Sequence, residues 1–373
     1  MENNKNNFIL PDFENSNLNI SATLAEFLGV PNKNKTIKIL EDELKKNYKN
    51  IVFICFDGLG INPININLRK DSFLRKNIKQ NLMSTFPSTT TNATTSLLTN
   101  KLPLEHGWFG WSLHFDNINK NINIFLNTDS WTNEKVEIKQ SPLMDKDYYF
   151  YHTNTDYCIN SIFPHFVEVK DKSKNNVYLT CDEFFNYIKN ICNKKEKQFI
   201  YAYYPDPDST MHVQGVTSFI TKSVIEDIDR RMEELYNSTK DTLFIVTADH
   251  GQVDIDGYVE IYKDEEIMEM LEYYPFLEAR AACFKLKKGM ENKFEEVFTN
   301  KYGEDFVLFK SKELIEKGYF GNVGDKAFLL GDYIAIGTYT HKQMLLTPVG
   351  PKFKGHHTSL TEEMVVPLIL INN

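Results

Sequence analysis

Short apolar runs that end abruptly in polar residues recur along the chain. Residues 51–56, 198–204 and 242–247 are apolar or aromatic stretches of strand length, and residues 364–371 form a fourth such run near the C-terminus. Runs of this kind are typical of strands that are buried on both faces of a sheet. A long amphipathic helix is predicted between the second and third runs by apolar residues at helical spacing, namely Ile220, Val224, Ile228, Met232 and Leu235.

Strands that alternate with helices predict an α/β fold, a doubly wound and mostly parallel sheet with helices on both faces. We expect one main domain over residues 51–373. Segments without a clear period, at about 112–197 and 252–345, are interpreted as insertions that form a cap over the ligand site. Residues 1–50 are interpreted as a covering helical segment, because Ile37, Leu40, Leu44 and Tyr48 share one helical face.

Composition limits the class of protein. The 373 residues are 42% hydrophobic, which is enough for a large core, and the formal net charge is −9. An acidic chain is poorly suited to the phosphate backbone of nucleic acids, so we expect no stable nucleic-acid complex and a small-molecule partner instead. Five scattered cysteines without a CxxC pair, a polar N-terminus and the lack of a long apolar run predict a cytoplasmic protein that is not associated with a membrane.

Acidic residues and histidines follow the predicted strand ends. Taken one at a time, an Asp-Gly pair is usually a turn and a single histidine usually a surface or capping residue. Together they are carboxylate and imidazole ligands of the kind that zinc and manganese prefer. In a doubly wound sheet they gather beyond the carboxyl ends of the strands, where ligands bind. Their number suits two metal ions, which can act on both oxygens of an in-line phosphoryl displacement.

A patch of hydroxyl side chains extends from Phe86 to Thr99 and opens a predicted helix. Serine and threonine are favoured in the first turn, where they satisfy free N–H groups, and a helix start attracts anions. Alone, the patch is interpreted as a loop and cap. Beside a two-metal site, one of its hydroxyls becomes a candidate nucleophile.

Five ordered motifs carry a resemblance to a known family. The chain resembles the alkaline phosphatase superfamily, and within it the type I phosphodiesterase/nucleotide pyrophosphatase branch, from about residue 50 to the C-terminus. The two insertions match no motif. The motifs that carry the resemblance are Asp57-Gly58, Phe86-Pro87-Ser88-Thr89-Thr90, Pro207-Asp208-Ser209-Thr210-Met211-His212, Asp249-His250-Gly251 and Gly355-His356-His357.

The resemblance implies a role for each matching residue. The nucleophile is Thr90, which lies three residues after the proline of its motif and at the family's spacing from Thr99 and His106-Gly107; Thr89 is the alternative. The implied cofactors are two divalent ions, with zinc favoured over manganese or iron. One ion takes Asp208, His212 and His357, and the other takes Asp57, Asp249, His250 and Thr90.

Two positions depart from the family pattern. An asparagine that helps to hold a phosphoryl oxygen lies three residues after the nucleophile in the family, whereas this chain has Ala93 there and Asn92 one residue earlier. Asn92 is therefore a candidate catalytic residue through a local shift. Relatives also follow the last metal-binding histidine with glycine, whereas His357 is followed by Thr358, and His357 is chosen over His356 by its spacing to the last strand.

The predicted function is a metal-dependent phosphodiesterase or nucleotide pyrophosphatase that acts through a covalent phosphothreonine. Trp108, Phe109 and Trp111 are expected to bind the organic group of the substrate, and Tyr203 and Tyr204 are either further stacking residues or core residues. The alternatives are a phosphomonoesterase or phosphonate hydrolase on the same ions, or a non-catalytic metal-stabilised binding protein. A sulfatase is disfavoured because the chain has no Cys-x-Pro-x-Arg segment.

Overall fold

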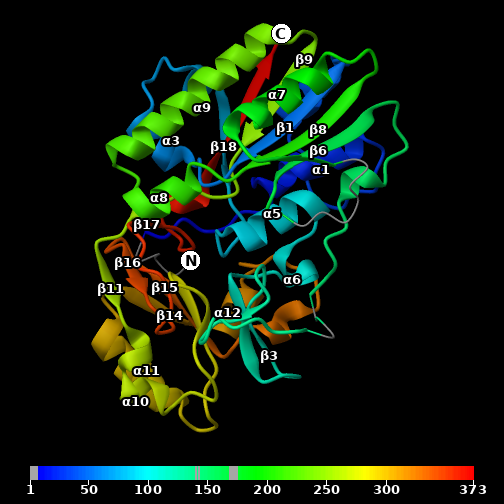
Figure 1. Cartoon of the computed structure of the whole chain (residues 1–373). Coiled ribbons are helices and arrows are strands. Elements are labelled where there is room, and N and C mark those ends of the chain that lie inside the picture. Colours follow the sequence, from blue (N-terminus) through cyan, green and yellow to red (C-terminus); the bar gives the residue numbers. More distant parts are fainter. Residues whose placement is uncertain (1–6, 139–140, 142, 168–174) are drawn as a thin grey trace.

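A seven-stranded sheet forms the centre of the computed structural model, which describes residues 7–138, 141, 143–167 and 175–373 (Figure 1). All of its strands run parallel except β18, which is antiparallel to both of its neighbours. This arrangement confirms the predicted mostly parallel α/β sheet. In spatial order the strands are β2 (Ile78–Met83), β18 (Val365–Asn372), β9 (Thr242–Thr247), β1 (Asn50–Phe56), β8 (Gln198–Tyr204), β6 (Cys158–Pro164) and β7 (Asn175–Tyr178).

Aromatic side chains of alternate strand positions cover opposite faces of this sheet, as the two-residue period of a strand requires. Phe56 packs edge-to-face on Phe184 of α7, while Phe53 packs on Tyr201, which in turn lies against Phe150 on the other face. One group of helices packs around α9, and another around α5. The first group is α3 (Ile61–Asn67), α4 (Phe73–Lys76), α7 (Cys181–Cys192), α8 (Asp208–Gln214) and α9 (Phe219–Ser238); the second is α1 (Leu18–Phe27), α2 (Lys38–Leu44), α5 (Thr90–Thr99) and α6 (Pro103–His106).

The N-terminal segment is integrated into the main body. The four residues expected on its buried face, Ile37, Leu40, Leu44 and Tyr48, are all buried. Just before α1, the Asn17 amide donates to the backbone carbonyls of residues 248 and 249, directly beneath the end of β9. The segment therefore supports one of the strand ends that carry the predicted site.

A second seven-stranded sheet, antiparallel throughout, lies below the first in Figure 1. Its strands come from both predicted insertions, so the two segments build one common sheet. The helices beside it are α10 (Glu265–Met268), α11 (Glu291–Tyr302) and α12 (Ser311–Glu316). In order its strands are β14 (Phe306–Lys310), β15 (Tyr333–Gly337), β13 (Ala281–Phe284), β12 (Phe276–Glu278), β3 (Ser112–Phe115), β4 (Lys120–Asn123) and β5 (Thr128–Asp129).

The structure divides the segment 112–197 between the two sheets. Strands β3, β4 and β5 belong to the second sheet, but β6 and β7 extend the main sheet beyond β8, and α7 packs on them. That part of the segment is therefore not cap. Strand β6 and the edge strand β7 have mixed polar and apolar sequences, such as Asn-Asn-Val-Tyr in β7, and so lack the apolar run that marks β1, β8 and β9.

The remaining short elements connect the two sheets or close their ends. Strand β10 (Val253–Asp254) pairs with β17 (Gly355–His356), and β11 (Gly257–Val259) pairs with β16 (Lys342–Met344). Single turns of 3-10 helix are η1 (Tyr149–Tyr151), η2 (Ile261–Lys263), η3 (Lys326–Leu329) and η4 (Glu362–Met364). No helix among the described residues has the combined length and apolar character needed to cross a bilayer.

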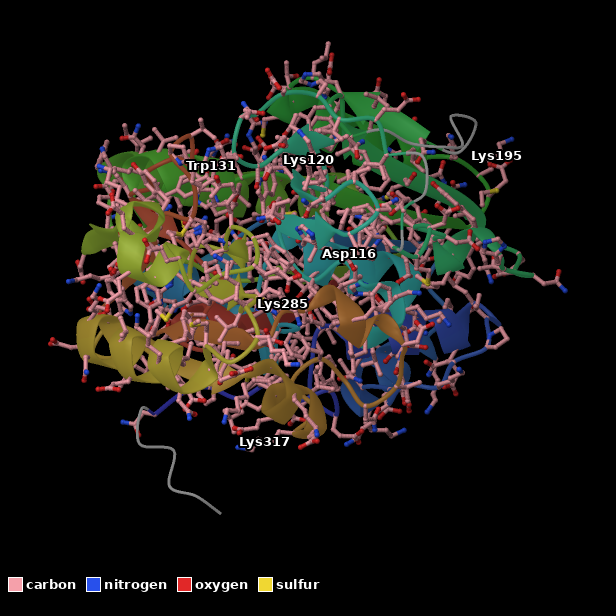
Figure 2. All side chains as sticks on the ribbon, turned by 90° about the horizontal axis from the view of Figure 1, so that it is seen from below. Asp116, Lys120, Trp131, Lys195, Lys285 and Lys317 are labelled. Atoms are coloured by element: carbon pink, nitrogen blue, oxygen red, sulfur yellow. The ribbon has the colours of Figure 1, made fainter. Side chains whose placement is uncertain are left out.

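The outer face of the second sheet carries charged side chains. Figure 2, which views the molecule from below, shows Asp116, Lys120 and Lys285 on this face. The two lysines are paired locally, Lys120 with Asp129 and Lys285 with Asp332. The ammonium groups of these two lysines are therefore already partnered by carboxylates.

Candidate active site

The site lies where three neighbouring parallel strands end. Strands β9, β1 and β8 are adjacent, and their carboxyl ends lead into Asp249-His250, Asp57 and the loop before Asp208. Because β18 runs in the opposite direction, the chain that precedes it brings His357 to the same edge of the sheet. Residues that are 300 positions apart in the sequence thus meet through strand order alone.

Thr90 is the first residue of α5, and its hydroxyl faces the acidic cluster. Its Oγ1 lies 3.4 Å from each carboxylate oxygen of Asp57 and 3.2 Å from Nε2 of His250. The neighbouring Thr89, the alternative nucleophile, occupies the N-cap position of α5 without a side-chain capping bond, and its hydroxyl donates to Glu278 at 2.7 Å. The geometry therefore favours Thr90 over Thr89.

The other hydroxyls of the patch stabilise the helix. Thr94, Thr95 and Thr99 each donate to the backbone carbonyl four residues earlier, at 2.5–2.7 Å. Such bonds satisfy hydroxyls that a buried helix cannot expose to water. These residues are buried, so their role is internal support of α5 and not solvent contact.

Two groups of side chains match the two predicted ligand sets. In the first, Asp208 lies 3.3 Å from Nε2 of His212 and 3.7 Å from Nε2 of His357. In the second, Nε2 of His250 lies 3.4 Å from Asp57 and 3.5 Å from Asp249. Ligand atoms of Asp57, Asp249 and His250 fall within 4.8 Å of one another, as do those of Asp208, His250 and His357, and those of His212, His356 and His357. The two candidate metal positions are therefore adjacent.

The ring orientation of the histidines suits metal binding. Nδ1 of His212, His250 and His357 lies 2.8–3.0 Å from a backbone carbonyl, of Gly355, Gly251 and Ser88 respectively. A carbonyl can only accept, so each Nδ1 is protonated and each Nε2 carries the free lone pair. His356 has no such bond, since its buried Nδ1 has no partner in the described structure. This difference supports the choice of His357 over His356.

The charge of the cluster favours bound cations. Three buried aspartates, Asp57, Asp208 and Asp249, share the site, and Oδ2 of Asp249 is buried without a hydrogen-bond partner among the described residues. Burial, together with the charges of Asp249 and Asp208, raises the pKa of Asp57 well above its ordinary value. Although burial opposes ionisation of Asp208, the neighbouring His212 holds the pKa of that carboxyl below its usual range. The residues present therefore fit divalent metal ions.

Two polar side chains that the sequence did not single out as ligand supports orient the carboxylates. The Tyr203 hydroxyl donates to Oδ2 of Asp57, and the Gln252 amide donates to Oδ1 of Asp208. The backbone N–H groups of Gly58 and His250 donate hydrogen bonds to Oδ1 of Asp249. The sequence predicted that Tyr203 stacks on a ligand or packs in the core. It did not predict this hydrogen bond, because a sequence does not show which group a tyrosine hydroxyl contacts.

A cavity of about 420 Å³ opens from the candidate metal positions toward the second sheet. Trp111 and Phe353 form aromatic parts of its wall, and Trp111 is 41% exposed. Of the three aromatic residues predicted to bind substrate, only Trp111 lines this cavity. Phe109 is fully buried against Phe320. The indole N–H of Trp108 donates a hydrogen bond to the Met144 carbonyl, and the Lys146 ammonium group lies over its ring.

Asn92 does not line the cavity. It is fully buried, and its amide nitrogen donates to the Pro87 carbonyl at 2.9 Å, so it ties the first turn of α5 to the preceding loop. The geometry favours a structural role for this side chain over contact with a phosphoryl oxygen.

Glu278 is a cavity residue that the sequence analysis missed. It ends β12, only 5% of its surface is exposed, and burial raises the pKa of its carboxyl to about 7. Its position in the second insertion, which has no readable motif, gave no signal in the sequence.

Comparison with known proteins shows the family and supports this reading of the fold. A family profile described as type I phosphodiesterase/nucleotide pyrophosphatase matches residues 51–322. Murine ectonucleotide pyrophosphatase/phosphodiesterase 5 is similar in structure, with a TM-score of 0.64, 18% identity, and coverage of 87% of this chain and 88% of that one. An inactive threonine-to-alanine variant of the same murine protein, solved in complex with AMP, has a TM-score of 0.63 at 18% identity, covering 86% of this chain and 87% of that chain.

A second kind of solved structure shares the fold. Phosphonoacetate hydrolase from Sinorhizobium meliloti 1021, in complex with phosphonoformate, has a TM-score of 0.59 and 13% identity, and the match covers 86% of this chain and 89% of that chain. Comparison with curated protein sequences gives no match.

Proposed function

The chain belongs to the type I phosphodiesterase/nucleotide pyrophosphatase family and is a hydrolase of phosphoester bonds; from this premise we propose that it is a two-metal phosphodiesterase that acts through a covalent phosphothreonine. The family and the acidic cluster together indicate a metal-dependent site. The substrate is a small phosphodiester or nucleotide, and Trp111 contacts its organic group.

Thr90 is the nucleophile in this proposal. Its Oγ1 attacks phosphorus, the bond to the leaving oxygen breaks, and a phosphothreonine forms; water then cleaves the bond between Oγ1 and phosphorus and restores the hydroxyl. Divalent ions, when bound, favour ionisation of the hydroxyl and stabilise negative charge on the leaving oxygen. The N–H groups at the start of α5 stabilise the remaining phosphoryl oxygens.

One observation carries the proposal: the Thr90 hydroxyl lies 3.2 Å from His250 and 3.4 Å from Asp57. Every other hydroxyl of the patch that donates a hydrogen bond in the described structure donates to a group outside this pair of residues. The murine relative with an alanine in place of a threonine is described as inactive, which agrees with a threonine nucleophile in this fold.

We assign the ligands by the distances above. Asp208, His212 and His357 hold one ion, and Asp57, Asp249, His250 and Thr90 hold the other. Carboxylate and imidazole ligands without a thiolate suit zinc, with manganese and iron as alternatives. The five cysteines are unpaired, and this favours a reducing compartment such as the cytoplasm.

The test is activity of the metal-loaded protein and its Thr90→Ala variant on bis-p-nitrophenyl phosphate, p-nitrophenyl phosphate and a nucleoside 5′-monophosphate nitrophenyl ester. We expect diester hydrolysis by the parent and a loss of at least about 10³-fold in kcat for the variant. Equal activity of the two proteins would remove Thr90 from the mechanism. A preference for the monoester would favour a phosphomonoesterase, and binding of two ions without turnover of any ester would favour a non-catalytic protein.

A further inference from the structure

Glu278 links the residue that precedes the proposed nucleophile to the cavity wall. Its Oε1 accepts hydrogen bonds from the Thr89 hydroxyl and from the backbone N–H of Trp111, both at 2.7 Å. Thr89 directly precedes the proposed nucleophile, and Trp111 forms the aromatic wall of the cavity. One carboxyl group of the second sheet is therefore held in a fixed position beside the place where phosphorus must bind.

The second oxygen of Glu278 is free to act on a substrate. Among the described residues no donor is bonded to Oε2. This oxygen is also not fully buried, and Glu278 lines the cavity, so Oε2 retains contact with it. The described residues that line the cavity include Asp208 and Glu278 but neither lysine nor arginine. The nearby lysines of the second sheet, such as Lys120 and Lys285, are on its outer face and paired with other carboxylates (Figure 2).

The charge balance of the site makes this carboxylate significant. Two divalent ions bring four positive charges, and the three aspartates and an ionised Thr90 bring four negative charges. The metal cluster is thus balanced by its own ligands, and apart from histidines such as His212, the described cavity wall supplies no basic side chain to offset the charge of Glu278.

We propose that Glu278 is a specificity-determining residue that selects against a second negative charge at the scissile phosphorus, so that the protein favours phosphodiesters over phosphomonoesters. The inference rests on the proposed function of the same site. A diester carries one negative charge, whereas a monoester above neutral pH carries two. The additional charge is repelled by a fixed carboxylate within a cavity of low dielectric constant.

The first test compares methyl p-nitrophenyl phosphate with p-nitrophenyl phosphate at pH 9, since these substrates share a leaving group and differ by one charge. In the Glu278→Gln variant the amide oxygen can still accept from Thr89 and Trp111. We expect kcat/KM for the monoester to rise at least about tenfold relative to that for the diester, through a lower KM for the monoester. The matched control is Glu272→Gln, because Glu272 is exposed in the bend that precedes β12 and lines a different cavity.

The second test needs no turnover. Calorimetry on the metal-loaded Thr90→Ala protein, with and without Glu278→Gln, measures binding of methyl phosphate and dimethyl phosphate. We expect the glutamine to tighten methyl phosphate binding about tenfold relative to dimethyl phosphate binding. A ratio that stays within twofold in either test overturns the role of Glu278 while diester hydrolysis by the parent leaves the proposed function intact. A parent protein that hydrolyses neither ester overturns both.

Discussion

The hydroxyl of Tyr203, one residue before the end of β8, donates a hydrogen bond to Oδ2 of Asp57, one residue after the end of β1. The two strands are parallel neighbours in which Cys55 is opposite Tyr203. The hydroxyl therefore reaches a carboxylate two residues further along the neighbouring chain, just past the end of β1. Hydrogen bonds of this kind fix the orientation of a metal-binding carboxylate and tune its basicity. The strand register therefore sets the geometry of one proposed metal ligand.

Tyr203→Phe should lower metal affinity. Without the hydroxyl, Asp57 loses the bond that orients it, and support residues of this kind are typically worth about 10–100-fold in metal affinity. Competition with a chelator of known affinity measures the change. Tyr204→Phe is the matched control, because the neighbouring ring packs against Phe56 and Phe184, away from the carboxylates. Equal metal affinity in the two variants would show that Tyr203 acts only through packing.

Much of the site follows from the sequence because it lies at strand ends. Apolar runs identify β1, β8 and β9, and adjacent parallel strands bring Asp57, Asp208 and Asp249 together without further information. Strands β6 and β7 could not be recognised in the same way, because their sequences mix polar with apolar residues and contain no continuous apolar run of strand length.

The support and specificity residues required the three-dimensional structure. Glu278 lies 189 positions from Thr89 and belongs to β12 of the second sheet, whereas Thr89 precedes α5, so only tertiary packing brings their side chains together. The directions of the Tyr203 hydroxyl and of the Trp108 ring are likewise set by neighbours that no local pattern specifies.

Removal of metal should make the protein less stable, increasingly so as pH rises. At an ion concentration 100-fold above its dissociation constant, binding contributes about 2.7 kcal/mol to the free energy of unfolding. In the metal-free protein the pKa of Asp57 is raised by burial and by its acidic neighbours. The stability that the protonated Asp57 carboxyl contributes to the folded state is therefore fully present below the unfolded pKa of about 3.8, and it is lost as pH rises through the folded pKa.

Asp57→Asn tests this charge effect. The variant should bind metal more weakly, yet in the presence of a chelator at pH 8 it should melt a few degrees above the chelated parent, because the amide removes one of three crowded carboxylates. Thermal melts between pH 5 and pH 8 measure the difference, which should narrow toward the acidic end. A chelated variant that melts below the chelated parent at pH 8 contradicts the prediction.

Trp111→Ala should weaken substrate binding. The indole lines the cavity and is 41% exposed, so it is available to a nitrophenyl ring, and aromatic contacts of this kind contribute about 0.5–1.5 kcal/mol. KM for bis-p-nitrophenyl phosphate should rise up to about tenfold, with a smaller change in kcat. Trp108→Ala should lower the melting temperature while KM stays within twofold, because that ring packs under Lys146. Equal KM changes in the two variants would place both rings at the substrate.

Arg280→Met should destabilise the loop that carries His357. Arg280 and Glu363 are both fully buried and form an ion pair at 3.2 Å, and the Arg280 backbone N–H donates to the Thr358 hydroxyl at 3.2 Å. Thr358 has a φ of 90°, a left-handed conformation that is rare for a β-branched residue, so this loop depends on the contacts that hold it. Removal of one partner leaves a buried charge unpaired, which costs about 3–5 kcal/mol in the free energy of unfolding.

Urea unfolding at fixed metal concentration measures this cost, and a second substitution separates charge from packing. The double variant Arg280→Met, Glu363→Gln removes the orphaned charge but keeps an acceptor for the N–H of Ser359, so it should recover at least about half of the loss. The partly exposed pair of Lys285 and Asp332 serves as the comparison, and Lys285→Met should cost no more than about 1 kcal/mol. If Arg280→Met costs as little as Lys285→Met, the buried pair does not stabilise the loop that follows His357.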